Sequence, residues 1–162
     1  MAPADRISIP RFASTEGGMI EGSCHCGGVR FRVDWQIQEL TTCDCSLCEM
    51  RGALMTKVPE SALEILSGED LLTLYQWNTH RARHYFCSRC GIYVFHRKRA
   101  APDHFGVNVR CLHDFDRASV PVRATEGANM TVEVPDPCDH WPGPRAQSSA
   151  RVQGETPFQS RI

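Results

Sequence analysis

The sequence predicts an all-β protein in which two small sheets pack together. Apolar and polar residues alternate with a period of two over 29–34 and again over 107–110, which is typical of strands that bury one face. Several other short segments are rich in β-branched and aromatic residues, and turn-forming dipeptides separate them. Helical periodicity is weak throughout the chain. These observations favour short strands joined by tight turns.

The expected strands follow one another through the middle of the chain. The first is the alternating segment at 29–34, in which Phe31 and the two valines face the core. The later strands are expected at 71–77, 82–86, 92–96, 107–110 and 120–125. Turns are expected between them at Ser67-Gly68, Asn78-Thr79 and Pro102-Asp103. Only residues 60–66 have helical character, for one or two turns at most.

The chain of 162 residues suits a single domain with two extensions. Residues 1–18 contain two prolines and two glycines and few periodic apolar residues, so we expect a flexible N-terminal arm. Residues 130–162 carry five prolines and a polar run, so we expect a Pro-rich C-terminal tail. The folded body is then expected at 19–129.

Composition excludes several function classes. Hydrophobic residues make up 41% of the chain and charged residues 23%, which is ordinary for a soluble globular protein. The formal net charge of -1 excludes a strongly basic nucleic-acid-binding protein. No apolar run approaches the about 18 residues of a membrane span, and the N-terminus lacks the apolar stretch of a signal peptide. We therefore expect a cytoplasmic protein with no nucleic-acid or membrane partner.

Cysteine usage is the unusual feature of this sequence. There are nine cysteines, an odd number, and no export signal, so metal binding explains them better than a disulfide framework. Seven of them lie in three tight motifs, at 24–26, 43–48 and 87–90. Thiolates at such spacings converge on one ion at about 2.3 Å each. Glycines after the paired cysteines allow tight turns, so that backbone N–H groups can reach the sulfurs.

Seven ligands divide unequally between two ions. A closed structural zinc site takes four ligands, and the simplest division joins the first and third motifs: Cys24, Cys26, Cys87 and Cys90. The second motif then supplies three thiolates to a second zinc ion: Cys43, Cys45 and Cys48. Three protein ligands with an open fourth position are typical of a catalytic zinc.

Other interpretations of the same cysteines stay open. Cys111 or Cys138 could complete a second structural site, and an iron–sulfur cluster also binds thiolates. Cys87 and Cys90 could form a redox dithiol, although this leaves the other five clustered cysteines without a role. Outside such roles Cys111 and Cys138 are expected to be ordinary small residues, and Cys111, which follows an alternating strand, to be buried.

Three segments of the sequence closely resemble the glutathione-dependent formaldehyde-activating enzyme family, which also includes centromere protein V. They are residues 22–31 (Gly-Ser-Cys-His-Cys-Gly-Gly-Val-Arg-Phe), 43–48 and 86–91. The resemblance covers about residues 19–127, and three residues between the motifs fit its spacing: Gly68, Leu72 and Tyr75. The segment 108–112 and the chain after residue 127 depart from the family pattern.

The resemblance implies an Mss4-like fold of small antiparallel sheets stapled by zinc. It implies the same division of ligands into one structural and one catalytic zinc site, two ions per chain. The family's named reaction joins formaldehyde and glutathione reversibly into S-(hydroxymethyl)glutathione, which implies a carbon–sulfur lyase whose partners are a small thiol and an aldehyde. A non-catalytic zinc-stabilised binding module of the same fold is the alternative, and a redox enzyme such as a sulfoxide reductase is a third hypothesis, favoured by an exposed Cys111 of low pKa.

The expected chemistry suggests roles for a few more residues. A zinc ion deprotonates a coordinated thiol, which could then add to an aldehyde carbon beside the cysteines of the second motif. Candidates for the proton donor to the resulting alkoxide are His84, His80 and Asp44, although we expect each histidine to be a surface residue on a strand face. Candidates for binding the carboxylates of a peptide thiol are Arg83, Arg110 and Asn108. His25 alternates with two ligands and is expected to point away from the first ion.

Overall fold

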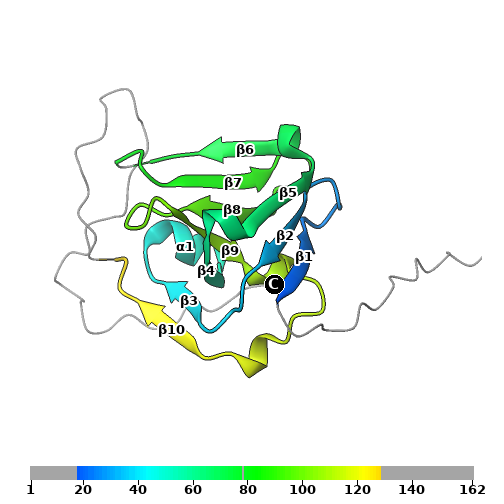
Figure 1. The fold of residues 1–162 in the computed structure, drawn as a ribbon. Helices are drawn as coiled ribbons and strands as arrows, with labels where there is room; N and C mark the ends of the chain where they lie inside the picture. Colours follow the sequence, from blue (N-terminus) through cyan, green and yellow to red (C-terminus); the bar gives the residue numbers. More distant parts are fainter. Residues whose placement is uncertain (1–17, 78, 129–162) are drawn as a thin grey trace, which may run out of the picture.

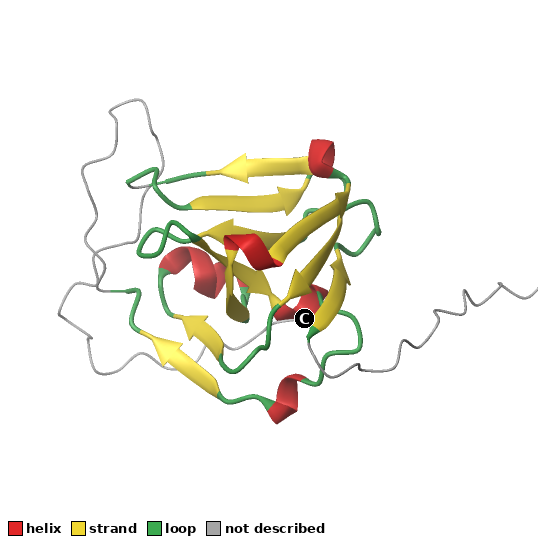
Figure 2. Ribbon diagram, in the orientation of Figure 1, coloured by secondary structure: helices red, strands yellow, loops and turns green. Residues whose placement is uncertain are grey.

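The computed structural model describes residues 18–77 and 79–128. The predicted N-terminal arm, apart from residue 18, and the predicted C-terminal tail therefore lie outside the described residues, as does Cys138. Within the described residues, strands dominate and helices are very short (Figures 1 and 2). The prediction of an all-β fold is confirmed.

The strands form two sheets of different size. The smaller sheet has the order β1 (Met19–Ser23), β2 (Arg30–Asp34) and β5 (Leu63–Ser67). The larger sheet has seven strands, in the order β10 (Val122–Thr125), β3 (Leu40–Cys43), β4 (Met55–Pro59), β9 (His104–Asn108), β8 (Tyr93–Arg97), β7 (Arg83–Cys87) and β6 (Leu72–Tyr75). All pairings are antiparallel except that of β10 with β3, which is parallel.

Helical structure is confined to short connections. The α-helix α1 (Ser46–Arg51) follows β3, and four 3-10 turns cover Glu60–Ala62, Glu69–Leu71, Val109–Cys111 and Arg117–Ser119. Within the described residues no helix is long and apolar enough to cross a membrane.

Most of the expected strands are present, but several details of the prediction are wrong. Strands β2, β6, β7, β8 and β10 occupy the segments predicted for them, whereas β9 ends at Asn108 because Val109 already begins a 3-10 turn. The helix expected at 60–66 is only a 3-10 turn, and its second half is the strand β5. The sequence pattern also missed α1 and three strands: β1, β3 and β4.

The pattern of β2 shows why alternation predicted it correctly. Phe31 and Val33 are fully buried, while Arg30 and Arg32 point to the other face. These arginines pair with glutamates on the two neighbouring strands, Arg30 with Glu21 at 3.1 Å and Arg32 with Glu64. Ion pairs of this exposed kind stabilise the register only modestly, so the buried face of β2 is what fixes its place.

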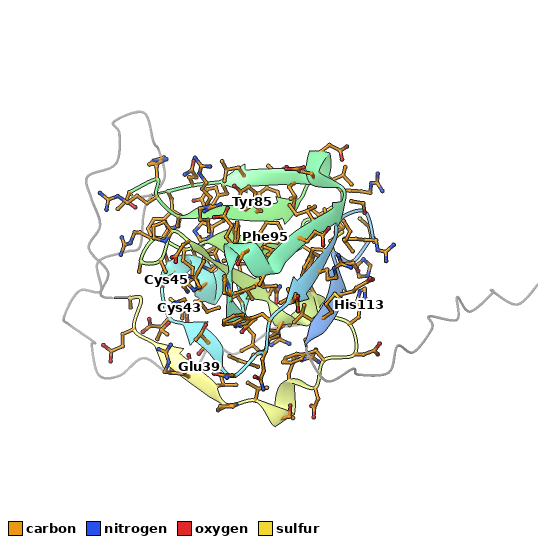
Figure 3. The ribbon with its side chains drawn as sticks, viewed as in Figure 1. Glu39, Cys43, Cys45, Tyr85, Phe95 and His113 are labelled. Atoms are coloured by element: carbon orange, nitrogen blue, oxygen red, sulfur yellow. The ribbon has the colours of Figure 1, made fainter. Side chains whose placement is uncertain are left out.

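One hydrophobic core joins the two sheets. Phe31 on β2 meets Phe95 on β8 edge to face, with ring centroids 6.1 Å apart, so the contact spans both sheets. Figure 3 labels Phe95 near the centre of the body. Other fully buried side chains of the same core are Val29, Val33, Leu40, Val58, Val94, Val107 and Val109. Cys24 and Cys87 also belong to this core, which places part of the first and third cysteine motifs in the interior.

Candidate metal centres and the cleft between the turns

The first cluster consists of Cys24, Cys26, Cys87 and Cys90, the set that ligand counting joined. Two of these residues lie in the turn between β1 and β2, and two at the end of β7 and in the turn to β8. All four sulfur atoms lie within 4.8 Å of one another. The structure therefore brings together two turns that are far apart in the sequence.

Local turn geometry brings these sulfurs into position. Gly27 and Gly91 have φ angles of 70° and 73°, in the left-handed region that favours glycine. Their backbone N–H groups donate to the carbonyl oxygens of Cys24 and Cys87, at 3.0 and 2.8 Å, so each cysteine pair closes a tight turn. The glycines that follow the paired cysteines in the sequence are thus explained by backbone conformation.

The first cluster fits a tetrahedral ion of the zinc type. Sulfur–sulfur distances are 3.5 Å for Cys24–Cys26 and 3.8 Å for Cys26–Cys87. Four sulfurs at about 2.3 Å from a tetrahedral zinc are roughly 3.8 Å apart. Burial raises the pKa of the Cys24 thiol to about 11, so its thiolate requires a nearby cation in this position. The backbone N–H of Val29 also lies 3.3 Å from the Cys24 sulfur and donates to it.

The second cluster consists of Cys43, Cys45 and Cys48, whose sulfurs also lie within 4.8 Å of one another. Cys43 ends β3, Cys45 is the N-cap of α1, and Cys48 lies in that helix. The Cys45 sulfur accepts a hydrogen bond from the backbone N–H of Cys48 at 3.5 Å. Within the described part of the chain, no fourth histidine, cysteine or carboxylate joins this group.

Without an ion, the second cluster favours one thiolate. Hydrogen bonds from the Cys45 and Cys48 thiols lower the pKa of the Cys43 thiol to about 2, and the same hydrogen bonds raise the pKa of the other two thiols. A thiolate is the form in which cysteine binds a metal, so the donor set suits a soft divalent ion such as zinc. Three sulfur ligands leave one tetrahedral position for another group.

The chain around residue 127 packs closely against the second cluster. Thr125 pairs with Cys43 in the parallel ladder between β10 and β3. A methyl group on Gly127 would overlap the Cys43 sulfur, so only glycine fits at this distance. The Asp44 carboxylate accepts hydrogen bonds from the backbone N–H groups of Gly127 and Ala128, the latter at 2.8 Å. Asp44, a candidate proton donor from the sequence, therefore fixes this segment beside the cluster.

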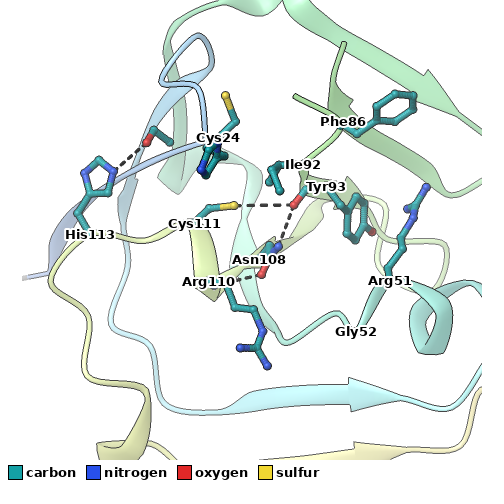
Figure 4. A pocket seen from close by; sticks show the side chains of 13 residues that line it. Cys24, Arg51, Gly52, Phe86, Ile92, Tyr93, Asn108, Arg110, Cys111 and His113 are labelled. Carbon is teal, nitrogen blue, oxygen red and sulfur yellow. Dashed lines mark hydrogen bonds between the residues drawn. The ribbon is translucent and has the colours of Figure 1, made fainter. Parts of the chain in front are cut away.

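A cleft of about 750 Å³ lies beside the first cluster and extends to the end of α1 (Figure 4). The turns of the first cluster supply one side of it and the 3-10 turn after β9 another. Its lining residues are Ser23, Cys24, His25, Arg51, Gly52, Phe86, Gly91, Ile92, Tyr93, Asn108, Arg110, Cys111 and His113. Of the predicted carboxylate-binding residues, Arg110 and Asn108 line this cleft and Arg83 does not.

His84 is buried and belongs to a network that sequence reasoning did not anticipate. Its side chain is only 5% exposed, so the expectation of a surface histidine is wrong. The Tyr93 hydroxyl lies 2.9 Å from His84 Nδ1 and 2.8 Å from His96 Nδ1. One hydroxyl can donate to one imidazole nitrogen and accept from the other, which satisfies all three groups. Burial lowers the pKa of His84 to about 4 and that of His96 to about 3, so both rings are neutral at pH 7.

The remaining candidates occupy different surroundings. His25 is exposed and lines the cleft, and His80 lies in the turn between β6 and β7. Cys111 is 6% exposed and burial raises its pKa to about 12. The prediction that Cys111 is buried is confirmed, and the exposed thiol of low pKa that a redox enzyme would favour is not found at this position.

Four residues of the site escaped sequence reasoning: Arg51, Tyr93, His96 and Gly127. The sequence placed Tyr93 and His96 only within an expected strand. It could not show that this strand pairs with the one that carries His84. Gly127 carries a weak signal, since an isolated glycine after a strand often marks a close backbone approach. Arg51 lies in the helix that the sequence pattern did not predict.

Comparison with known proteins agrees with this arrangement. The profile of the family described as "Glutathione-dependent formaldehyde-activating enzyme" matches residues 19–126. A protein of Halomonas elongata whose name carries the same family description is 32% identical over 88 residues, which cover 48% of this chain and 56% of that protein. The chain thus spans just over half the length of this curated relative. A crystal structure of a Rhodobacter sphaeroides protein matches with 38% identity and a TM-score of 0.58, over 64% of this chain and 99% of that one.

Proposed function

This chain belongs to the glutathione-dependent formaldehyde-activating enzyme family, and on that premise we propose that it is a zinc-dependent carbon–sulfur lyase. The reaction adds a thiol, glutathione or a similar molecule, to a small aldehyde such as formaldehyde, reversibly. The second cluster is the catalytic zinc site and the first cluster the structural one. One observation carries this proposal: the seven clustered cysteines meet as a group of four and a group of three.

Cys43, Cys45 and Cys48 would hold the catalytic ion and leave one position for the substrate thiol. When bound there, zinc would supply deprotonation of that thiol at neutral pH, where a free thiol is mostly protonated. The sulfur electron pair then forms the new bond to the aldehyde carbon, and the carbonyl oxygen takes up a proton. The thiol gives up one proton and the oxygen gains one, so the adduct forms without net proton uptake.

The parts of the chain around the second cluster keep its sulfurs in place. Cys45 is held at the helix start by its bond with the Cys48 N–H. Gly127 packs directly against the Cys43 sulfur. The Asp44 carboxylate holds the chain there by accepting hydrogen bonds from the backbone N–H groups of Gly127 and Ala128. Such support keeps the ligand geometry fixed while the substrate exchanges, which is what a catalytic metal site requires.

The first cluster has a different task in this proposal. Cys24 and Gly91 line the cleft from the two turns that the cluster joins. A structural ion at these four sulfurs would hold the cleft wall together, because no strand ladder connects β1 or β2 to β7 or β8. The family reaction would therefore depend on the first ion through the shape of the cleft, and on the second ion through its chemistry.

The proposed function is tested by the rate of adduct exchange. Zinc-loaded protein should accelerate interconversion of formaldehyde, glutathione and S-(hydroxymethyl)glutathione above the spontaneous rate, as measured by exchange NMR spectroscopy. Cys45→Ser should lose this acceleration while it stays folded, and Cys138→Ser, a change of a cysteine outside the three sequence motifs, should keep it. Wild-type protein with two zinc ions that accelerates no thiol–aldehyde exchange, or a folded Cys45→Ser protein with normal turnover, would contradict the proposal.

A further inference from the structure

The cleft beside α1 is lined by two guanidinium groups and by no carboxylate. Two arginines line it, Arg51 and Arg110, and its lining residues include no aspartate or glutamate. Asn108 and His113 also line it, and both side chains form hydrogen bonds within the chain. A cleft with this composition favours an anionic ligand, since carboxylates are the natural partners of guanidinium groups.

Arg51 differs from the arginines on the protein surface. Four arginines of the described chain form ion pairs with glutamates: Arg30, Arg32, Arg97 and Arg123. Arg51 forms no ion pair with a carboxylate of residues 18–77 and 79–128, and its Nη1 atom is buried without a hydrogen-bond partner there. A buried donor that belongs to a charged group and has no acceptor is costly, so an anion from outside the chain would satisfy it.

Aromatic rings hold the Arg51 side chain in place. Its guanidinium lies 4.2 Å from the centroid of the Tyr93 ring and 5.6 Å from that of Tyr75. Tyr93 is itself fixed, because its hydroxyl lies between His84 and His96. Arg51 is thus positioned by stacking, which leaves its Nη1 atom for a ligand and lowers the entropy that binding would cost.

The position of Arg51 connects the cleft to the second cluster. Arg51 lies three residues after Cys48 on α1, and side chains at this spacing are neighbours on one helix face, roughly 5–6 Å apart at Cβ. Figure 4 shows Arg51 on the opposite side of the cleft from Cys24, whose cluster would carry negative charge when four thiolates hold a zinc ion. A carboxylate is therefore favoured at the Arg51 side of the cleft.

From these observations we propose that Arg51, stacked on Tyr93, is the residue that binds a carboxylate of the substrate thiol. The inference rests on the proposed function, because it places the thiol sulfur at the second cluster and the carboxylate at Arg51 in the same molecule. It deepens that function by naming the residue that determines the preference for a carboxylate-bearing thiol over an uncharged one.

The test uses a ligand that has the carboxylates but no free thiol. Binding of S-methylglutathione and of its diethyl ester to zinc-loaded, full-length protein is measured by isothermal titration calorimetry. The wild type should bind the acid at least tenfold more tightly than the ester, and Arg51→Met should lose roughly tenfold in affinity for the acid and almost none for the ester. Arg51→Lys should restore part of the loss. Arg83→Met, the same change at an exposed arginine of β7 outside the cleft, should bind like the wild type.

The outcomes separate this inference from the proposed function. Equal binding of acid and ester by the wild type, or an equal loss for both ligands in Arg51→Met, would overturn the role of Arg51 even if adduct exchange is catalysed. An Arg51-dependent preference for the acid in a protein that catalyses no exchange would support the inference about the cleft and would overturn the proposed lyase activity. Thermal unfolding and zinc content of each variant establish that the comparison is between folded, metal-loaded proteins.

Discussion

The two cysteine clusters use the same side chain but assemble it in opposite ways. Cys26 and Cys87 of the first cluster are 61 residues apart, whereas the second cluster lies within residues 43–48. The first set of ligands therefore exists only in the folded chain, while the second can form locally. Metal-binding free energy becomes folding free energy only where the unfolded chain lacks the site. The separation of the ligands along the sequence, and not only their number, therefore distinguishes an ion that stabilises the fold from an ion that takes part in catalysis.

The largest expected effect is the loss of the first cluster. Cys87 is fully buried and joins β7 to the other turn, so Cys87→Ser should abolish cooperative folding of the body. A structural zinc contributes roughly 10–16 kcal/mol of apparent binding free energy, which equals or exceeds the about 5–15 kcal/mol of a whole domain. Thermal unfolding followed by circular dichroism measures this. A Cys87→Ser protein that unfolds cooperatively near the wild-type temperature would contradict the claim that the first cluster holds the fold.

A change in the second cluster should leave the fold nearly intact. In Cys45→Ser the new hydroxyl can still cap α1, because serine is a preferred N-cap residue. We expect one zinc ion per chain to be lost and the free energy of unfolding to change by about 1–2 kcal/mol at most. Metal analysis together with urea unfolding tests this. Loss of both ions, or unfolding as severe as in Cys87→Ser, would show that the second cluster also holds the fold.

Gly127→Ala tests the second cluster separately from the first, and it replaces none of the seven clustered cysteines. The added methyl group would overlap the Cys43 sulfur, and overpacking of this kind costs about 1–3 kcal/mol. We expect faster release of the second ion to a chelator and unchanged release of the first. Gly52→Ala is the control, since its methyl group would meet no atom within 4 Å, although unlike Gly127 this position has a positive φ, of 56°, which strains alanine. Equal metal release in the two variants would mean that Gly127 does not shape the second cluster.

A further prediction concerns the buried histidines, which belong to neither cluster. The pKa of His84 is lowered by burial to about 4, below the about 6.5 of an exposed imidazole. Between these values the unfolded chain binds a proton that the folded chain does not, so the stability from this group is complete above about pH 6.5 and is lost as pH falls toward 4. His84→Phe should therefore reduce the slope of unfolding free energy against pH in this window by up to about 1.4 kcal/mol per pH unit.

Urea unfolding of the wild type and His84→Phe at several pH values measures this slope. Both proteins keep all seven clustered thiols, so proton uptake by the metal ligands cancels in the difference. Identical slopes would show that His84 is protonated as easily in the folded protein as in the unfolded chain.

The success of the sequence analysis follows the range of the interactions. Alternation predicted β2 because one face is buried on every second residue, and ligand counting joined the first and third motifs because zinc requires four donors. The helix α1 escaped because six residues are too few to show a period of 3.6, and its start depends on Cys45 as the N-cap. The strand β5 was read as helical because its exposed residues, such as Glu64 and Leu66, do not alternate cleanly in polarity.

Long-range features that no ligand count constrains could not be predicted from one sequence. The parallel pairing of β10 with β3 joins segments about 80 residues apart, and the ion pair between Arg123 and Glu39 at 2.8 Å that accompanies it is a consequence of that pairing. The cleft is another long-range feature, because the Arg51 guanidinium is positioned by the Tyr93 ring on which it stacks. Pairings of this kind depend on the packed tertiary structure, which local patterns do not encode.

Cadmium-113 NMR spectroscopy tests the central claim most directly, because cadmium is also bound by thiolates and each site gives its own signal. The account predicts two signals, one from a site of four sulfurs and one from a site of three. On addition of glutathione only the second signal should move, to the range of four sulfurs. S-methylglutathione, which has no thiol, should leave the second signal at its original position. A single signal, or two signals that glutathione does not change, would contradict an open thiol position at Cys43, Cys45 and Cys48.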